Sequence, residues 1–273
     1  MGGSIARTRD KFGRVSADPV QVKRNALLGV ALALIVAGGA AALVGSPTAV
    51  ANAQSCGAGA NGSQGYAYAG HQATGVSHGI RATITPTAAA NVISGHVAGW
   101  IGVGGPGQGA NGQTLWLQVG VASIPDTPTM VYAEITRGGQ DPVFVPLVQD
   151  VQVGESHRVA VLEMAGRPNW WRVWLDGKPA TDPVLLEDST NRWRPIATGE
   201  SWNGGRAVCN SFAFRFDGVG VAAATGGSWR PFAPGYKFQD RGFGVKRLSA
   251  APGSQRTLSG GAPMPYAFEA SSL

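Results

Sequence analysis

The sequence predicts an all-β protein, built as a sandwich or a barrel of antiparallel strands. Short runs rich in valine, isoleucine, tryptophan and phenylalanine alternate with turn-forming clusters, and the 273 residues include 41 glycines and 17 prolines. Amphipathic helical periodicity is almost absent, and no internal repeat is found. Such a pattern is typical of many short strands joined by tight turns. With 44% hydrophobic and 14% charged residues, the chain can bury one full core.

The first 53 residues predict an export segment. A basic stretch is followed by an apolar run over residues 25–45 and by small residues that end in Ala51-Asn52-Ala53. This order is the pattern of a signal peptide cleaved after Ala53. The apolar run is also long enough for a transmembrane helix that stays as a signal anchor. Both alternatives place the rest of the chain outside the cell, either secreted or attached to the membrane through this segment alone.

Charge and motif content exclude several function classes. Beyond residue 24 the chain has 16 basic and 14 acidic residues, too even a balance for a nucleic-acid groove. The four histidines show no spacing typical of a metal site, so no metal is expected. The glycine-rich run 102–107 contains Pro106 where a dinucleotide-binding motif needs a helix to begin, and no cofactor is expected.

The two cysteines, Cys56 and Cys209, are expected to form a disulfide in an oxidising compartment. Two unpaired thiols are the alternative. A disulfide between them would join the start of the exported part to a late strand.

We expect a flexible lead-in over residues 54–78, a β-sandwich domain over 79–249 and a disordered tail over 250–273. The tail has few apolar residues to pack, and the lead-in is rich in glycine, alanine and serine. Residues 222–249 are aromatic and basic and suggest an added hairpin. Strands are expected at about 79–85, 95–103, 114–121, 130–137, 143–149, 156–164, 170–176, 184–187, 195–202 and 211–221.

Alternation within these strands places polar groups beside aromatic rings on one face. Successive side chains of a strand point to opposite sides of the sheet. In residues 115–121 the leucines and valines therefore make one face, and Trp116 and Gln118 lie together on the other. Exposed aromatic clusters of this kind indicate a binding surface, although a loop could instead cover them as a second core. The residues predicted for such a groove are Trp100, Trp116, Gln118, Tyr132, Glu134, Trp170, Trp174, Glu200 and Trp202.

Several short motifs resemble those of the eqolisins, the glutamic peptidases. They are WIG at 100–102, LQVG at 117–120, YAE at 132–134, the Asp176-Gly177 turn and GESW at 199–202. The resemblance implies a concanavalin-A-like (jelly-roll) two-sheet sandwich, exported and active on proteins at acid pH. It also implies Gln118 and Glu200 as the catalytic pair, in a cleft lined by Trp100, Trp116, Tyr132, Glu134 and Trp202. Two features depart from the family pattern: Val121 and Ala122 stand where an acidic residue is typical, and Ser201 separates Glu200 from its tryptophan.

The chemistry of such a pair would be hydrolysis of a polypeptide by an activated water. A carboxylate at Glu200 would take a proton from the water, and the amide of Gln118 would donate to the oxyanion. Two alternatives use the same face. A binding module could hold a polysaccharide and cleave nothing, and a glycoside hydrolase could use Glu134 and Glu200 as its two carboxyl groups. A peptidase requires Glu200 near Gln118, whereas a glycosidase requires two facing acids.

Overall fold

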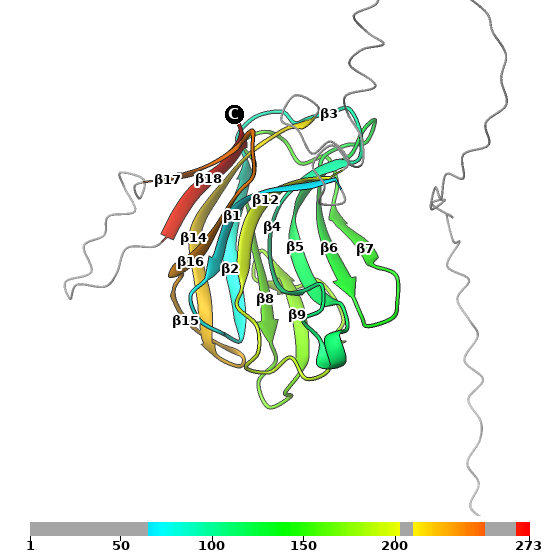
Figure 1. Cartoon of the computed structure of the whole chain (residues 1–273), viewed down its shortest axis with the longest axis vertical. Helices are drawn as coiled ribbons and strands as arrows, with labels where there is room; N and C mark the ends of the chain where they lie inside the picture. The colour runs from blue at the N-terminus through cyan, green and yellow to red at the C-terminus, as the bar shows by residue number, and fades with distance from the viewer. Residues whose placement is uncertain (1–64, 203–209, 249–265) are drawn as a thin grey trace, which may run out of the picture. The chain divides into compact units, whose positions relative to one another are not determined.

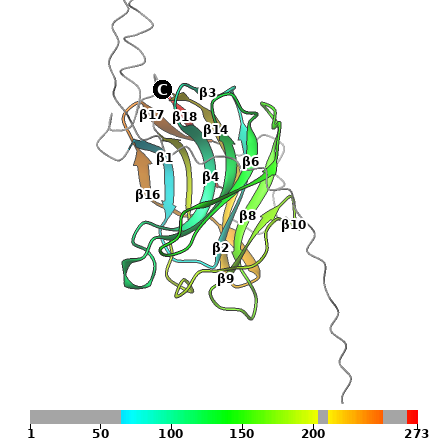
Figure 2. The same cartoon turned by 90° about the vertical axis from the view of Figure 1, so that its right-hand side faces the viewer.

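The structure is a computed structural model that describes residues 65–202, 210–248 and 266–273. In these ranges the chain forms two large antiparallel sheets that lie against each other in two layers (Figures 1 and 2). The one helical element there is a single short turn, η1 (Ala110–Gly112). The prediction of an all-β antiparallel sandwich is therefore confirmed.

The first layer is a seven-stranded sheet that crosses the molecule from β16 to β7. Its order is β16 (Pro234–Gln239), β1 (Tyr66–Ala73), β12 (Ile196–Trp202), β4 (His96–Gly105), β5 (Leu115–Ser123), β6 (Met130–Thr136) and β7 (Val143–Val148).

The second layer is a nine-stranded sheet. Its main path is β10 (Lys178–Pro179), β9 (Trp170–Leu175), β8 (His157–Glu163), β2 (Gly79–Pro86), β14 (Ala213–Ala224), β18 (Tyr266–Ser272) and β17 (Phe243–Arg247). Two short strands complete it, β11 (Val184–Leu185) beside β9 and β15 (Gly227–Pro231) beside β14. A separate pair joins β3 (Asn91–Val92) to β13 (Asn210–Ser211).

The core lies between the two layers and follows the alternation read from the sequence. Every second residue of β4, β5 and β6 turns its side chain inward, and the apolar members of this set are almost fully buried. The opposite layer contributes large rings as well as branched aliphatic groups. Fully buried side chains of the core include Ile80, Ile84, Ile101, Leu117, Trp171, Trp193, Phe214, Phe216, Phe243 and Phe268.

Two glycines at the centre of the seven-stranded sheet set how closely the layers approach. Gly99 on β4 and Gly199 on β12 lie directly opposite each other. A Cβ atom on Gly99 would lie 2.5 Å from Phe214 Cγ, and one on Gly199 would lie 2.5 Å from Phe212 Cε2. The two phenylalanine rings therefore occupy the space that side chains at these positions would need. They set the distance between β12, the strand that carries Glu200, and the opposite sheet.

Two segments expected to be loose form central parts of the sheets. Residues 66–73, placed in the predicted lead-in, form β1, which pairs with β12 from Tyr66 to Gln72. Residues 266–272, placed in the predicted tail, form β18 between β14 and β17. Both expectations were wrong because these strands are rich in small residues, and alanines such as Ala67 and Ala69 are buried as completely as valines would be.

The expected hairpin in residues 222–249 is present only at its start, where the end of β14 turns into β15 and Ala224 lies opposite Gly227. The other two strands of the segment pair elsewhere, β16 with β1 and β17 with β18. Each of these two strands is the last strand at one end of its sheet.

The predicted signal segment 1–53, its apolar run 25–45, Cys56 and Cys209 lie outside the described residues. Within the described ranges, no helix has the length and apolar character needed to cross a membrane.

Candidate active site

The outer side of the seven-stranded sheet carries the polar and aromatic residues predicted for a functional face. We call this side the acid–aromatic face; it is the surface of the sheet turned away from the main core. Its residues are Tyr66, Tyr68, His96, Trp100, Trp116, Gln118, Tyr132, Glu134, Glu200 and Trp202.

Strand register places Gln118 and Glu200 on this same face. Gln118 lies opposite Gly102 of β4, and Glu200 lies opposite Ala98 of β4. Positions 98 and 102 differ by an even number, so their cross-strand partners project to the same side of the sheet. The amide and the carboxylate therefore come from β5 and β12, on either side of β4.

Gln118 is held by two residues of β6. Its Nε2 atom donates to the hydroxyl oxygen of Tyr132 at 3.1 Å and lies 3.5 Å from Oε2 of Glu134. Glu134 lies directly opposite Gln118 and also accepts a hydrogen bond from the indole nitrogen of Trp116 at 3.0 Å. Gln118 is only 9% exposed, so these bonds form in a largely desolvated setting that strengthens them.

Glu200 is held by two ring nitrogens from β4. Trp100 Nε1 donates to Oε2 at 3.0 Å, and His96 Nε2 lies 2.9 Å from Oε1. Each carboxylate oxygen therefore has a nitrogen partner. Glu200 is 5% exposed, and no Lys or Arg of the described residues forms an ion pair with it.

Electrostatic coupling links the two halves of the face. Burial raises the pKa of Glu134, the charge of Glu200 raises it further, and the Trp116 hydrogen bond and the charge of His96 oppose the rise. Burial, then Glu200, then Glu134 also keep the pKa of Tyr132 well above its ordinary value. The charge of Glu200 therefore acts on both of the β6 residues that Gln118 contacts.

Aromatic rings surround the polar groups on both sides. Trp202 stacks on His96 with ring centres 5.5 Å apart, and Tyr66 lies against Trp202 at 6.1 Å. On the far side, Tyr132 stacks on Phe144 of β7 at 4.8 Å. Burial, with smaller contributions from Glu200 and Glu134, raises the pKa of Tyr66 to about 12. The tyrosines of this face are therefore neutral at any pH at which the carboxylates titrate.

Two of the tryptophans predicted for this face belong elsewhere. Trp170 and Trp174 lie on β9, which is part of the nine-stranded sheet. The strand alternation was read correctly, since Trp171 between them is fully buried, but alternation does not reveal to which sheet a strand belongs.

Three members of the face were not identified from the sequence: His96, Tyr66 and Tyr68. His96 could have been found by extending the alternation of Trp100 back by four residues. The two tyrosines alternate with buried alanines in β1, but the small residues of this segment also give it the composition of a flexible lead-in.

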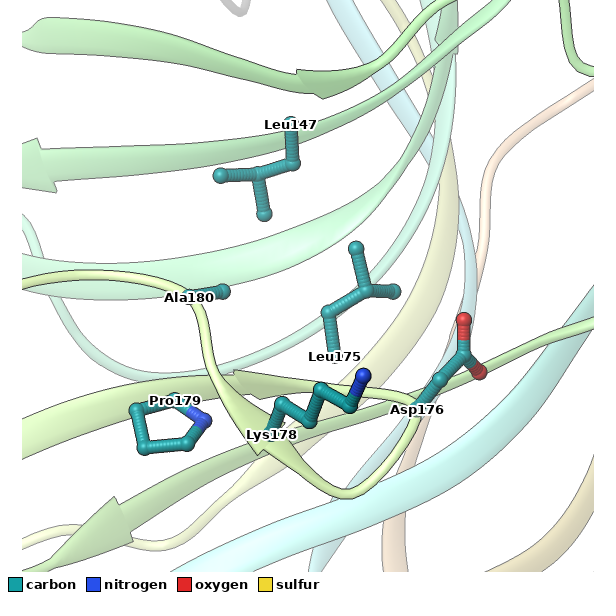
Figure 3. Close-up of a pocket in the computed structure, with 6 residues that line it drawn as sticks. All are labelled: Leu147, Leu175, Asp176, Lys178, Pro179 and Ala180. Atoms are coloured by element: carbon teal, nitrogen blue, oxygen red, sulfur yellow. The ribbon is translucent and has the colours of Figure 1, made fainter.

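A separate cavity of about 460 Å³ lies at the β7 end of the sandwich (Figure 3). It is lined by Leu147, Leu175, Asp176, Lys178, Pro179 and Ala180, none of which belongs to the acid–aromatic face. The carboxylate of Asp176 accepts a hydrogen bond from the backbone N–H of Arg158 and forms a second hydrogen bond with the imidazole of His157. In the described part of the chain, no three His, Cys, Asp or Glu side chains are grouped to hold a metal ion.

No protein-family model matches the chain, and no curated protein matches it. Among solved structures, the chain is similar to scytalido-glutamic peptidase bound to a peptide-based transition-state analogue, with 14% identity, a TM-score of 0.47 and coverage of 76% of this chain and 98% of the peptidase. It is also similar to SCP-B, an eqolisin-family peptidase in complex with the tripeptide Ala-Ile-His (14% identity, TM-score 0.44, 76% and 97% coverage). A β-glucanase of Bacillus licheniformis has 20% identity and a TM-score of 0.32 over 49% of this chain and 56% of the glucanase. None of these TM-scores reaches 0.5.

Proposed function

We propose that this chain is a glutamic-peptidase-like hydrolase of concanavalin-A-like architecture that cleaves polypeptides at acid pH. The observation that carries the proposal is that a buried amide, Gln118, and a buried carboxylate, Glu200, project from β5 and β12 to the same face of one sheet. Each is oriented by its own set of ring or hydroxyl partners.

In this proposal Glu200 is the general base. Its carboxylate takes one proton from a water molecule while the water oxygen forms a bond to the carbonyl carbon of the peptide. The carbonyl oxygen becomes an oxyanion. The protonated Glu200 then gives its proton to the amide nitrogen as the carbon–nitrogen bond breaks, which yields a carboxylic acid and an amine.

Gln118 supplies the donor to the oxyanion. One of its N–H groups is committed to Tyr132, and the other makes the longer 3.5 Å contact with Glu134. A protonated Glu134 is a weaker acceptor than a carboxylate, so the second N–H becomes free for the oxyanion when Glu134 is neutral. Because the pKa of Glu134 is raised, that neutral form persists to higher pH than for an ordinary glutamate, which favours an acid-active enzyme.

The test is an assay of the purified full-length chain on acid-denatured protein substrates between pH 3 and pH 5. Gln118→Ala and Glu200→Gln should each lower kcat/KM by at least about 100-fold. The matched controls are Gln152→Ala and Glu187→Gln, which change the same residue types at exposed positions away from the face. Equal cleavage by the wild type and both face variants would refute the proposed pair.

The second candidate is a glycoside hydrolase, favoured by the presence of two largely buried carboxyl groups, Glu134 and Glu200, on the same face. Under that mechanism both carboxyl groups are essential, so Glu134→Gln would abolish activity on β-glucans. The peptidase mechanism requires only that Glu134 be neutral. A third candidate is a polysaccharide-binding module, which would retain an oligosaccharide and hydrolyse no substrate.

We further propose that the protein acts outside the cell, secreted or attached through residues 25–45. The support is the order of charged, apolar and small residues in the first 53 positions. N-terminal sequencing of the protein recovered from culture medium and from membranes would decide between cleavage after Ala53 and anchoring.

A further inference from the structure

His96 lies beside the proposed general base and was not required by the mechanism above. Its Nε2 atom is 2.9 Å from Oε1 of Glu200, and its ring is stacked on Trp202. The side chain of His96 is 29% exposed and that of Glu200 is 7% exposed. A hydrogen bond and a ring stack therefore fix the orientation of the imidazole over the carboxylate.

A protonated His96 would be the cation in contact with the carboxylate of Glu200. The titratable groups of this face are Glu200 on β12, Glu134 and Tyr132 on β6, and Tyr66 and Tyr68 on β1, with Asp240 beside Tyr68. The tyrosines stay neutral because burial, above all, raises the pKa of each. The remaining groups are three carboxylates and the imidazole of His96, and no Lys or Arg of the described residues forms an ion pair with any of these carboxylates.

We propose that His96 is a positioning residue that, as an imidazolium, holds Glu200 ionised and correctly oriented at acid pH. This inference rests on the proposed peptidase function. A cation in hydrogen-bond contact with a carboxylate favours its charged form, and only the ionised Glu200 can accept a proton from water. Histidine is suited to this role because its imidazole can both donate a hydrogen bond and carry a positive charge.

The position of His96 also explains how it can orient Glu200 without blocking it. His96 and Trp100 are four residues apart on β4, on either side of Ala98, which is the direct cross-strand partner of Glu200. Their ring nitrogens therefore reach the two carboxylate oxygens from opposite ends. Ala98 carries only a methyl group, so the direct cross-strand partner of Glu200 on β4 does not cover the carboxylate.

The experiment compares the pH dependence of kcat/KM for the full-length wild type and His96→Gln. Glutamine retains an N–H donor for Glu200 but carries no charge. The acid side of the profile should move to higher pH by about one unit, which corresponds to an approximately tenfold lower kcat/KM at a given pH on that side. The loss should diminish towards neutral pH, whereas a purely structural defect would lower kcat/KM by the same factor at every pH.

The matched control is His157→Gln. His157 also lies close to carboxylates, at 3.1 Å from both Glu155 and Asp176, but it is on β8 of the other sheet. His157→Gln should not shift the acid side of the pH profile of kcat/KM. If His96→Gln and His157→Gln both give the wild-type profile, the proposed role of His96 is overturned.

A second measurement does not depend on activity. In ¹H–¹⁵N spectra of the histidine side chains at acid pH, the Nε2–H of His96 should be protected from solvent exchange in the wild type and lose that protection in Glu200→Ala. If no variant cleaves any protein but this protection is observed, the peptidase function fails and the pairing stands. An Nε2–H that exchanges freely in the wild type would refute the pairing itself, whether or not His96→Gln folds.

Discussion

Gln118 donates from Nε2 to the hydroxyl oxygen of Tyr132, 3.1 Å away on the neighbouring strand. This bond determines which way the amide points, because the aromatic ring of Tyr132 is itself fixed by its stack on Phe144 and is only 2% exposed. The hydroxyl group of Tyr132 is thus the nearer of the two β6 groups that orient the proposed oxyanion donor, with Glu134 at 3.5 Å as the other.

Replacing Tyr132 with phenylalanine removes that hydroxyl and keeps the ring. We expect kcat to fall by about tenfold with little change in KM, because a misdirected amide weakens an interaction made mainly in the transition state. Steady-state assays of Tyr132→Phe at acid pH measure this split. A rise in KM with unchanged kcat would show that Tyr132 serves substrate binding instead.

Glu134→Gln tests the proposed role of a neutral side chain at this position. The variant imitates protonated Glu134, so activity at pH 4 should stay within about tenfold of the wild type, and the alkaline side of the pH profile should move to higher pH. The assay is kcat/KM on protein substrates from pH 3 to pH 8. Complete loss of protein cleavage at pH 4 would contradict the mechanism.

In Glu134→Gln the free energy of unfolding should also depend less on pH than in the wild type. Because burial and Glu200 raise the pKa of Glu134 in the folded state, the folded chain binds this proton more tightly than the unfolded chain. The stabilising contribution is complete below the ordinary glutamate pKa and is lost as the pH rises through the folded pKa. Glu134→Gln should therefore lose less unfolding free energy than the wild type between pH 4 and pH 7. Urea unfolding at both pH values measures the difference, and an equal loss in both proteins would contradict it.

Gly199→Ala should destabilise the sandwich at its centre. The added Cβ would lie 2.5 Å from the ring of Phe212 and 3.0 Å from the Cβ of Ala270, so the two layers would have to move apart. Overpacking of this kind costs typically about 1–3 kcal/mol of unfolding free energy. Gly75→Ala is the control, since nothing lies within 4 Å of the added atom. Similar midpoints of thermal unfolding for the two variants would contradict this account.

Much of the face could be read from strand alternation alone. Trp116 and Gln118, and Tyr132 and Glu134, are on the side that their spacing predicts, because a buried core strand has no freedom to turn its apolar positions outward. Alternation is a local property, however, and the assembly of strands into sheets is not. The insertion of β1 beside β12 depends on pairings between residues more than 100 positions apart in the chain. The separation of Trp170 and Trp174 from the face depends on the pairing of β8, the neighbour of β9, with the distant strand β2.

Strands rich in alanine and glycine were the hardest elements to predict from the sequence. A strand such as YAYAGHQA has the composition of a linker, yet Gly70 is required because a Cβ there would lie 2.4 Å from Cα of Thr198. His96 was missed for a different reason. Its function arises from contact with Glu200, 104 positions away, and a lone histidine at a strand end carries no signal of that contact.

Asn210 lies outside the acid–aromatic face, but we expect it to stabilise the two strand ends that carry His96 and Glu200. It is fully buried, and its side-chain amide donates to the carbonyl oxygen of Ser94, to Oγ of Ser201 and to the carbonyl oxygen of Trp202, while its oxygen accepts from the backbone of Ile93 and Ser94. These bonds join the end of β12 to the turn that precedes β4.

Asn210→Ala would leave several of these buried groups unpaired, which costs about 1–3 kcal/mol for each group that finds no water. We expect a loss of about 3 kcal/mol in unfolding free energy and a further loss of activity, because the turn before β4 sets the position of His96, and the end of β12 that of Glu200. Asn91→Ala, at an exposed position of β3, should change stability by less than about 0.5 kcal/mol. Denaturant unfolding of the two variants beside the wild type measures the difference. A loss for Asn210→Ala no larger than that for Asn91→Ala would show that these bonds do not hold the two strand ends together.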